Sequence, residues 1–136
     1  MKLNFAFTIA AVAGIASVVS AAEVDLSKLP AASTKTGLTY ATDIKPIFDT
    51  SCVKCHGEQK PKAKLRLDSL EGALKGGEDG KVITAGNSTK SILVLSIAHL
   101  GDADDFMPPP KNKIGIKQLT DEQIGLVRAW IDQGAK

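Results

Sequence analysis

The chain has 136 residues, with 17 Lys plus Arg against 15 Asp plus Glu, and 43% of its residues are hydrophobic. This length and composition are ordinary for one globular domain and exclude an intrinsically disordered chain. Because its positive and negative charges are nearly balanced, the chain lacks the strongly basic face that nucleic-acid binding requires. We therefore expect no nucleic-acid partner.

The first 22 residues differ from the rest. Lys2 is followed by an apolar run over residues 5–19 and then by three small residues that end at Ala22. This pattern is typical of a secretory signal peptide cleaved after Ala22. An uncleaved membrane anchor is the alternative, but about 15 apolar residues fall short of the roughly 20 that span a bilayer. We therefore expect an exported, periplasmic protein that keeps no stable membrane insertion after cleavage.

The segment after the signal peptide shows no clear pattern until the first helix. Residues 23–39 are rich in turn-forming residues and lack periodicity, which predicts an extended, poorly ordered N-terminal arm. A first helix is expected over about residues 42–50, with Thr42 or Asp43 as its N-cap. This helix leads directly to Cys52.

Two short helices are expected in the middle of the chain. Asp68 and Glu71 resemble a capping box for the first, which ends at Gly76. Ser88 can cap the second, which extends to about Leu100. The segments between the helices carry the turn residues of long loops.

The last helix has the clearest pattern. Thr120 and Gln123 form a capping box, and apolar residues follow at helical spacing. Trp130 on this helix is expected to pack against Phe48 of the first helix. The fold class is therefore all-α, with four to five short helices and long loops, a pattern that needs a cofactor at its centre.

The sequence Cys52-Val53-Lys54-Cys55-His56 is a C-x-x-C-H motif. Two thiols at this spacing can form thioethers with the vinyl groups on one edge of a haem, and the adjacent imidazole then lies close to the iron. We therefore predict one haem c, covalently attached to Cys52 and Cys55, with His56 as the proximal iron ligand. Both cysteines are used in this motif, so none is left for a structural disulfide.

Other uses of a C-x-x-C pair are a redox-active disulfide and half of a zinc site. A thioredoxin-like disulfide requires alternating strands and helices, and the sequence carries little strand signal. A zinc site requires further ligands, but residues 23–136 hold no second Cys pair and only His99 as another His.

Met107 is the predicted distal iron ligand. Residues 23–136 offer two further good ligands besides His56, namely His99 and Met107. Met107 precedes three prolines, which stiffen a loop that can present a thioether to the distal face of the haem. Core filling is the alternative for Met107, and a partly exposed position near a helix end is the alternative for His99.

Basic residues gather around the motif. They are Lys54, Lys60, Lys62, Lys64 and Arg66. A positive rim of this kind can steer an acidic redox partner to the haem edge, although it is equally well explained as a solvated loop. Arg66 can also pair with a haem propionate.

Five separated segments together resemble the planctomycete-type cytochrome c domain. They are the motif at 52–57, the sequence Leu-Arg-Leu-Asp-Ser at 65–69, the glycines at 76, 77 and 80, Met-Pro-Pro at 107–109 and Trp-Ile-Asp-Gln-Gly-Ala at 130–135. The resemblance covers roughly residues 40–136 and implies a class I cytochrome c-like fold around one covalently bound haem. It also implies that Cys52 and Cys55 are the thioether pair and that His56 and Met107 are the axial ligands. Members often occur as one module of larger proteins, whereas here we expect the haem module alone.

These features predict a mono-haem electron carrier, in which the iron cycles between the ferric and ferrous states while both axial positions stay filled. The alternative is a haem-based sensor, or an accessory module, in which Met107 leaves the iron so that a small ligand can bind. No enzymatic activity is expected, because no distal His or Arg constellation accompanies the motif. We expect a monomer that meets its donor and acceptor proteins through brief contacts.

Overall fold

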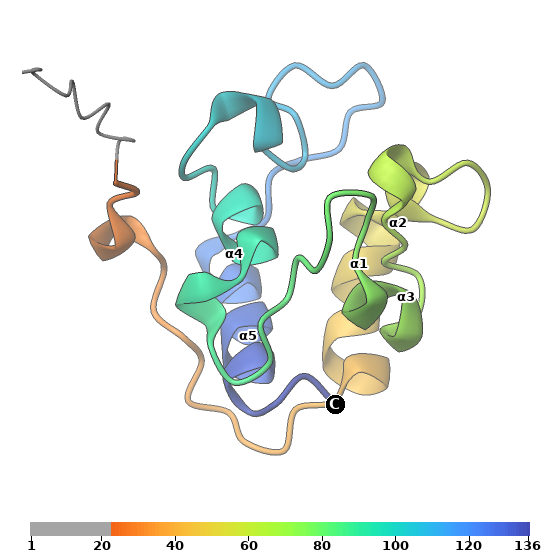
Figure 1. Cartoon of the computed structure of the whole chain (residues 1–136). Helices are drawn as coiled ribbons and strands as arrows, with labels where there is room; N and C mark the ends of the chain where they lie inside the picture. Colours follow the sequence, from red (N-terminus) through yellow and green to blue (C-terminus); the bar gives the residue numbers. More distant parts are fainter. Residues whose placement is uncertain (1–22) are drawn as a thin grey trace, which may run out of the picture.

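The computed structural model describes residues 23–136, and in this part of the chain the fold is helical without β-strands (Figure 1). The α-helices are α1 (Lys45–Ser51), α2 (Val53–His56), α3 (Leu70–Lys75), α4 (Ile92–Ile97) and α5 (Asp121–Asp132). The predicted all-α class, with short helices and long loops, is confirmed. The signal peptide predicted over residues 1–22 lies outside the described residues.

The first helix begins earlier than predicted. A π-helical turn, Tyr40–Ile44, continues into α1, and its N-cap is Thr39, whose side chain accepts a hydrogen bond from the Thr42 amide at 3.3 Å. The prediction that Thr42 or Asp43 is the N-cap is therefore wrong. Asp43 instead accepts a hydrogen bond from the Thr39 amide at 3.0 Å, so that residues 39 and 43 tie the turn together from both sides.

The cap of α3 also differs from the prediction. Ser69 caps this helix and accepts a hydrogen bond from the Gly72 amide at 3.1 Å. Asp68, the predicted cap, pairs instead with the guanidinium of Arg66 at 2.7 and 2.9 Å. The predicted end of the helix at Gly76 is confirmed.

Helix α4 is shorter than predicted because Ser88 does not cap it. Ser88 begins a separate 3₁₀ turn, and its amide and hydroxyl bind the carboxylate of Asp132 at 2.7 and 3.0 Å. Ser91 occupies the N-cap position of α4, and the regular helix ends at Ile97. Sequence pattern alone does not show that Asp132, on α5, competes for the Ser88 side chain.

The core forms where α5 packs against α1 and α4. The capping box of Thr120 and Gln123 that begins α5 is present as predicted. Trp130 of α5 is fully buried and meets Phe48 of α1 edge to face, with ring centroids 6.4 Å apart. The Tyr40 ring lies 6.0 Å from the same indole, so three aromatic rings join the two ends of the chain.

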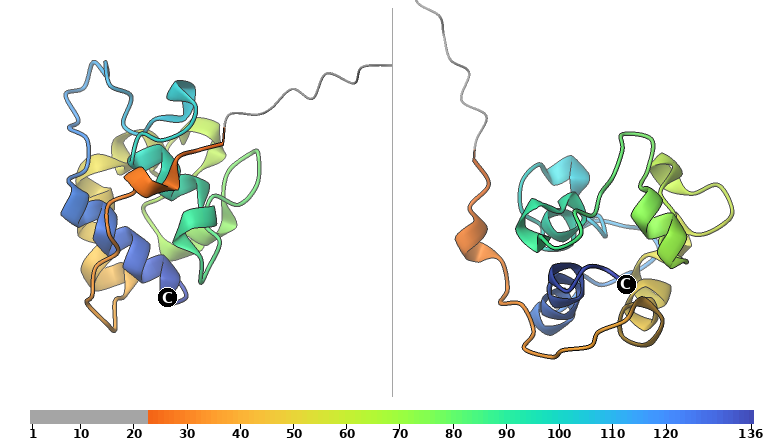
Figure 2. Two further views of the ribbon diagram at one scale, coloured as in Figure 1. Left: turned by 90° about the vertical axis from the view of Figure 1, so that its left-hand side faces the viewer. Right: turned by 60° about the horizontal axis from the view of Figure 1, so that its bottom comes forward.

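The N-terminal arm runs along α5 (Figure 2), which differs from the poorly ordered segment that we expected over residues 23–39. The Ser33 amide donates to the carbonyl of Gly125 at 2.9 Å, and the Leu38 amide donates to the side chain of Gln133 at 3.2 Å. These contacts use main-chain atoms of the arm, which leave no periodicity in the sequence.

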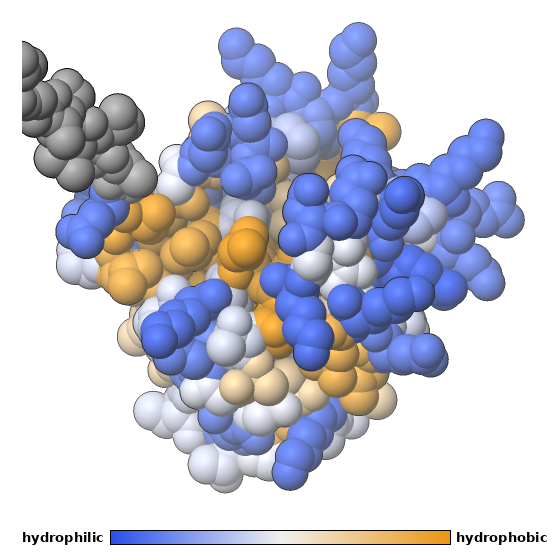
Figure 3. All heavy atoms as spheres, viewed as in Figure 1, coloured by the Kyte–Doolittle hydropathy of each residue, from blue (hydrophilic) through white to orange (hydrophobic). Residues whose placement is uncertain are grey.

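The face of the molecule shown in Figure 3 has two parts. Hydrophilic side chains crowd the part that contains α2 and α3, whereas apolar side chains surface beside the N-terminal arm. Two large apolar side chains in the described part of the chain, Leu26 and Ile92, are 46% and 54% exposed to solvent. Within residues 23–136, no helix has the length and hydropathy to cross a membrane.

Candidate functional site

The C-x-x-C-H motif lies on one tight turn of helix. Cys52 ends α1 and begins α2, and its carbonyl oxygen accepts hydrogen bonds from the amides of Cys55 at 3.0 Å and His56 at 2.9 Å. Cys52 is buried and Cys55 is half-buried, and both are free thiols. This turn holds both sulfurs and the imidazole at the wall of one hollow.

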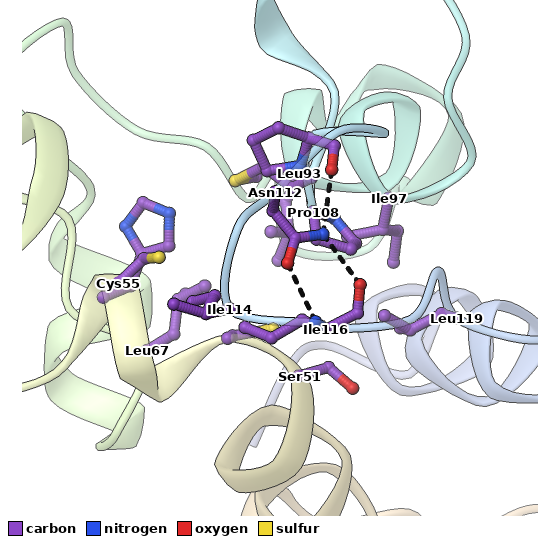
Figure 4. Close-up of a pocket in the computed structure, with 14 residues that line it drawn as sticks. Ser51, Cys55, Leu67, Leu93, Ile97, Pro108, Asn112, Ile114, Ile116 and Leu119 are labelled. Carbon is purple, nitrogen blue, oxygen red and sulfur yellow. Dashed lines mark hydrogen bonds between the residues drawn. The ribbon is translucent and has the colours of Figure 1, made fainter.

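That hollow is a mainly apolar pocket between the α1–α2 junction, α4 and the loop that follows Met107 (Figure 4). Its lining residues include Cys52, Cys55, His56, Leu67, Leu93, Ile97 and Met107. A second, more open hollow adjoins it and shares four lining residues with it, namely Cys55, His56, Met107 and Pro109. All four residues predicted to hold the cofactor, Cys52, Cys55, His56 and Met107, therefore line the same hollow.

The His56 ring is oriented by the chain that follows the motif. Nδ1–H donates to the carbonyl of Leu65 at 3.2 Å, and the amide of Leu67 donates to the carbonyl of His56 at 2.7 Å. The Nδ1–H tautomer leaves the lone pair of Nε2 available. Burial lowers the pKa of His56, although its backbone hydrogen bonds with Leu65 and Lys62 act in the opposite direction. The imidazole is thereby kept in the neutral form that binds a metal.

Gly57 allows the chain to turn away directly after the motif. A Cβ at this position would lie 2.6 Å from the carbonyl oxygen of Val53, which is closer than side chains tolerate. The crowding at this position comes from the backbone of α2 itself.

Met107 is held by its backbone. The Met107 amide donates to the carbonyl of Ser96, near the end of α4, at 3.1 Å. The side chain is partly buried, packs against the core and lines both hollows. The loop position predicted for this residue is therefore what the structure shows, and the thioether faces the hollow that His56 also lines.

His99 lies outside both hollows. Its ring stacks on Phe106 with the centroids 4.6 Å apart and the planes at 8°. Nε2–H donates to the carbonyl of Pro108 at 2.9 Å. The geometry therefore favours Met107 over His99 as the distal ligand.

The alternatives for the cysteine pair find no support in residues 23–136. Burial, followed by the neighbouring Cys55, raises the pKa of Cys52 to about 12, whereas redox-active thiols in C-x-x-C motifs have lowered pKa values. The described residues contain no strands for a thioredoxin-like sheet and no group of three or more side chains that could hold a metal ion.

The basic residues around the motif have different surroundings. Lys62 lines the second hollow. Lys64 lies 3.9 Å from Glu78, with both side chains exposed. Arg66 makes two hydrogen bonds to Asp68 and lines neither hollow, so its suggested pairing with a haem propionate has no support in this arrangement.

Two contributors to the site were missed in the sequence. One is the carbonyl of Leu65, a main-chain atom without any sequence signal. The other is Asn112, which ties the loop after Met107 together: its amide nitrogen donates to the carbonyls of Pro109 and Ile116 at 3.0 and 2.8 Å, and its oxygen accepts from the Ile116 amide at 2.8 Å (Figure 4). An Asn shortly after a proline run is the one hint that the sequence offers.

The residues around the hollow fit a haem. Two thiols, an imidazole and a thioether line a mainly apolar hollow, and these are the side chains that attach a haem c and ligate its iron. Residues 52–111 match the model of a family described as planctomycete cytochrome C. No curated protein matches the chain, and neither does any solved structure. The match over residues 52–111 agrees with the resemblance that the motifs predicted, and a cytochrome c family implies haem as the cofactor.

Proposed function

We propose that the protein is a mono-haem c-type electron carrier. Cys52 and Cys55 form the thioethers, and His56 and Met107 are the axial ligands of the iron. The observation that carries this proposal is the apolar hollow, whose wall contains both thiols, the imidazole and the thioether. When bound, the haem supplies one-electron chemistry at its iron.

The protein's own residues hold and orient the two axial ligands. The Leu65 carbonyl fixes the tautomer and the plane of His56, and a hydrogen bond of this kind raises the basicity of a ligating imidazole. The backbone bond from Met107 to Ser96 anchors the loop that carries the thioether. Apolar side chains, among them Leu67 and Ile97, surround the hollow and disfavour water there. A pair of His and Met ligands in apolar surroundings favours a raised reduction potential.

We further propose that the protein works after export, as a monomer that meets redox partners through brief contacts, and that it is not an enzyme. Export is supported by the C-x-x-C-H motif, which is typical of covalent haem attachment, because cytochrome c domains are usually exported. The lysines close to the motif in the sequence, Lys54, Lys60 and Lys62, support an acidic partner face.

The test is the visible spectrum of the protein made with cytochrome c maturation machinery. We expect covalent haem that survives denaturation, and a weak ferric band in the red that reports a bond between methionine and iron. Met107→Ala should lose this band. Ile114→Ala is the matched control, because Ile114 lines the same hollow and cannot bind iron.

Carbon monoxide separates the carrier from the sensor. The ferrous carrier should change little under the gas, because both axial positions are filled, whereas Met107→Ala should bind it. A wild-type protein without covalent haem would overturn the proposal. A five-coordinate wild-type haem that binds carbon monoxide readily would replace the carrier with the sensor.

A further inference from the structure

Both neighbours of Met107 in the sequence are held by one side chain, that of His99. The His99 ring lies flat against the Phe106 ring, and its Nε2–H donates to the carbonyl of Pro108 at 2.9 Å. His99 itself adopts a left-handed backbone conformation, with φ of 53°, directly after the end of α4. This conformation costs energy for a residue with a side chain. The contacts around His99 must therefore offset this cost.

A third contact joins the same two segments. The amides of Met107 and of His99 both donate to the carbonyl of Ser96, at 3.1 and 3.2 Å. The end of α4 and the segment Phe106–Pro108 are therefore joined by one aromatic stack, one side-chain hydrogen bond and one shared carbonyl. His99 supplies the first two and lines neither hollow.

We propose that His99 is a positioning residue, which clamps Phe106 and Pro108 to the end of α4 and thereby sets how firmly Met107 stays on the iron. The inference deepens the proposed function and rests on Met107 being an axial ligand. Because His99 lies outside the hollow, it acts through the loop and not by contact with the haem. The His99 side chain stacks on one neighbour of Met107 and donates a hydrogen bond to the other.

The clamp predicts a defined change in ligand competition. An added ligand binds the ferric iron only in molecules whose Met107 is displaced, so its apparent affinity scales with the displaced fraction. Loss of one hydrogen bond should raise that fraction by about tenfold. Loss of the stack on Phe106 should raise it by a factor of similar size.

The experiment is a spectroscopic titration of the ferric holoprotein with imidazole. His99→Phe keeps the stack and loses the donor, His99→Gln keeps a donor and loses the stack, and His99→Ala loses both. We expect the apparent imidazole affinity to rise by about tenfold in His99→Phe, by a comparable factor in His99→Gln and by most in His99→Ala. Gln133→Ala is the control: it removes two side-chain bonds that tie the N-terminal arm to α5, far from Met107, and should leave the affinity unchanged.

Hydrogen exchange gives a second readout that does not depend on the iron. The Met107 amide, bonded to Ser96, should exchange faster in the His99 variants and at the wild-type rate in Gln133→Ala. Unchanged imidazole affinity and unchanged exchange in folded His99 variants would overturn the clamp, as would an equal rise in Gln133→Ala. If the wild-type protein lacks the red ferric band, the proposed function fails. The inference about the iron then fails too, even if the exchange of the Met107 amide responds to His99.

Discussion

The two ring nitrogens of His56 have different surroundings. Nδ1 is bound by the Leu65 carbonyl at 3.2 Å, whereas Nε2 keeps its lone pair available at a hollow that Cys52, Cys55 and Met107 also line. The C-x-x-C-H spacing alone predicted which residue would be the ligand, because motif geometry is local. The orientation of the ring depends on a carbonyl nine residues later in the chain, which the motif does not specify.

Tyr40, the single tyrosine, is a second residue whose chemistry depends on its surroundings. Its hydroxyl donates to the Leu67 carbonyl at 2.8 Å, and burial, followed by the charges of Asp49 and Asp68, raises the pKa of Tyr40 to about 12. The unfolded chain releases this proton near pH 10. The stabilising contribution is therefore fully present below about pH 10 and is lost as the pH rises from about 10 to about 12.

We expect tyrosinate absorbance of the folded holoprotein to appear with a midpoint near pH 12. The free energy of unfolding, measured by denaturant between pH 9 and pH 11, should fall more steeply in the wild type than in Tyr40→Phe. The variant keeps the buried ring and removes the proton, so it corrects for the titration of lysines. A tyrosinate midpoint near pH 10 would contradict the burial argument.

At the scale of elements, α5 organises the chain. It packs against α4 and the turn Tyr40–Ile44, meets Phe48 of α1 through Trp130, and also receives the N-terminal arm, whose Ser33 amide binds the Gly125 carbonyl at 2.9 Å. The sequence predicted α5 well because its capping box and apolar stripe are local. It did not predict the docking of the arm, because that contact joins main-chain atoms about ninety residues apart in the chain.

Gly125→Ala tests this docking. A Cβ at residue 125 would lie 2.6 Å from the carbonyl oxygen of Ala31, so the arm must move away. We expect the Ser33 amide to lose its protection in hydrogen exchange. The change in global stability should be small, because alanine favours the helix by about 1 kcal/mol over glycine.

Glu122→Ala is the control for Gly125→Ala. It changes an exposed residue in the first turn of the same helix and should leave the Ser33 amide protected. Full protection of Ser33 in Gly125→Ala would show that the arm does not depend on its close approach to α5.

At the scale of the whole molecule, the aromatic side chains and the hollow occupy different regions. Tyr40, Phe48 and Trp130 fill the junction of α1 with α5. The space bounded by Leu67, Leu93 and other aliphatic side chains has no large ring of the protein's own. A haem in that space supplies the apolar surface that the chain lacks.

Removal of the haem attachment should therefore destabilise the fold. We expect Cys52→Ala/Cys55→Ala, expressed without haem, to melt at least about 10 °C below the holoprotein, since a loss of about 2 kcal/mol already gives such a shift in a domain of this size. Circular dichroism measures the melt, and near-ultraviolet signals report Trp130. Equal melting temperatures would mean that the protein folds without needing a group in the hollow.

The second prediction at this scale concerns charge. Lys62 lines the open hollow, so Lys62→Glu should slow the oxidation of the ferrous protein by ferricyanide roughly threefold at low ionic strength. The difference should shrink in high salt, because screening weakens steering. Lys90→Glu carries the same change of charge away from both hollows and should have a smaller effect. Equal slowing in the two variants would assign the effect to net charge alone.

The sequence by itself determined the helical class, the motif that carries Cys52, Cys55 and His56, and the helix that Thr120 begins. Each of these depends on residues within a few positions of one another, where propensity and spacing act directly. Tertiary structure decided the caps Thr39 and Ser69, the docking of the arm, the orientation of His56 and the clamp on the Met107 loop. Those features depend on main-chain atoms and on competition between distant polar groups, such as Asp132 for Ser88, which only the packed chain brings together.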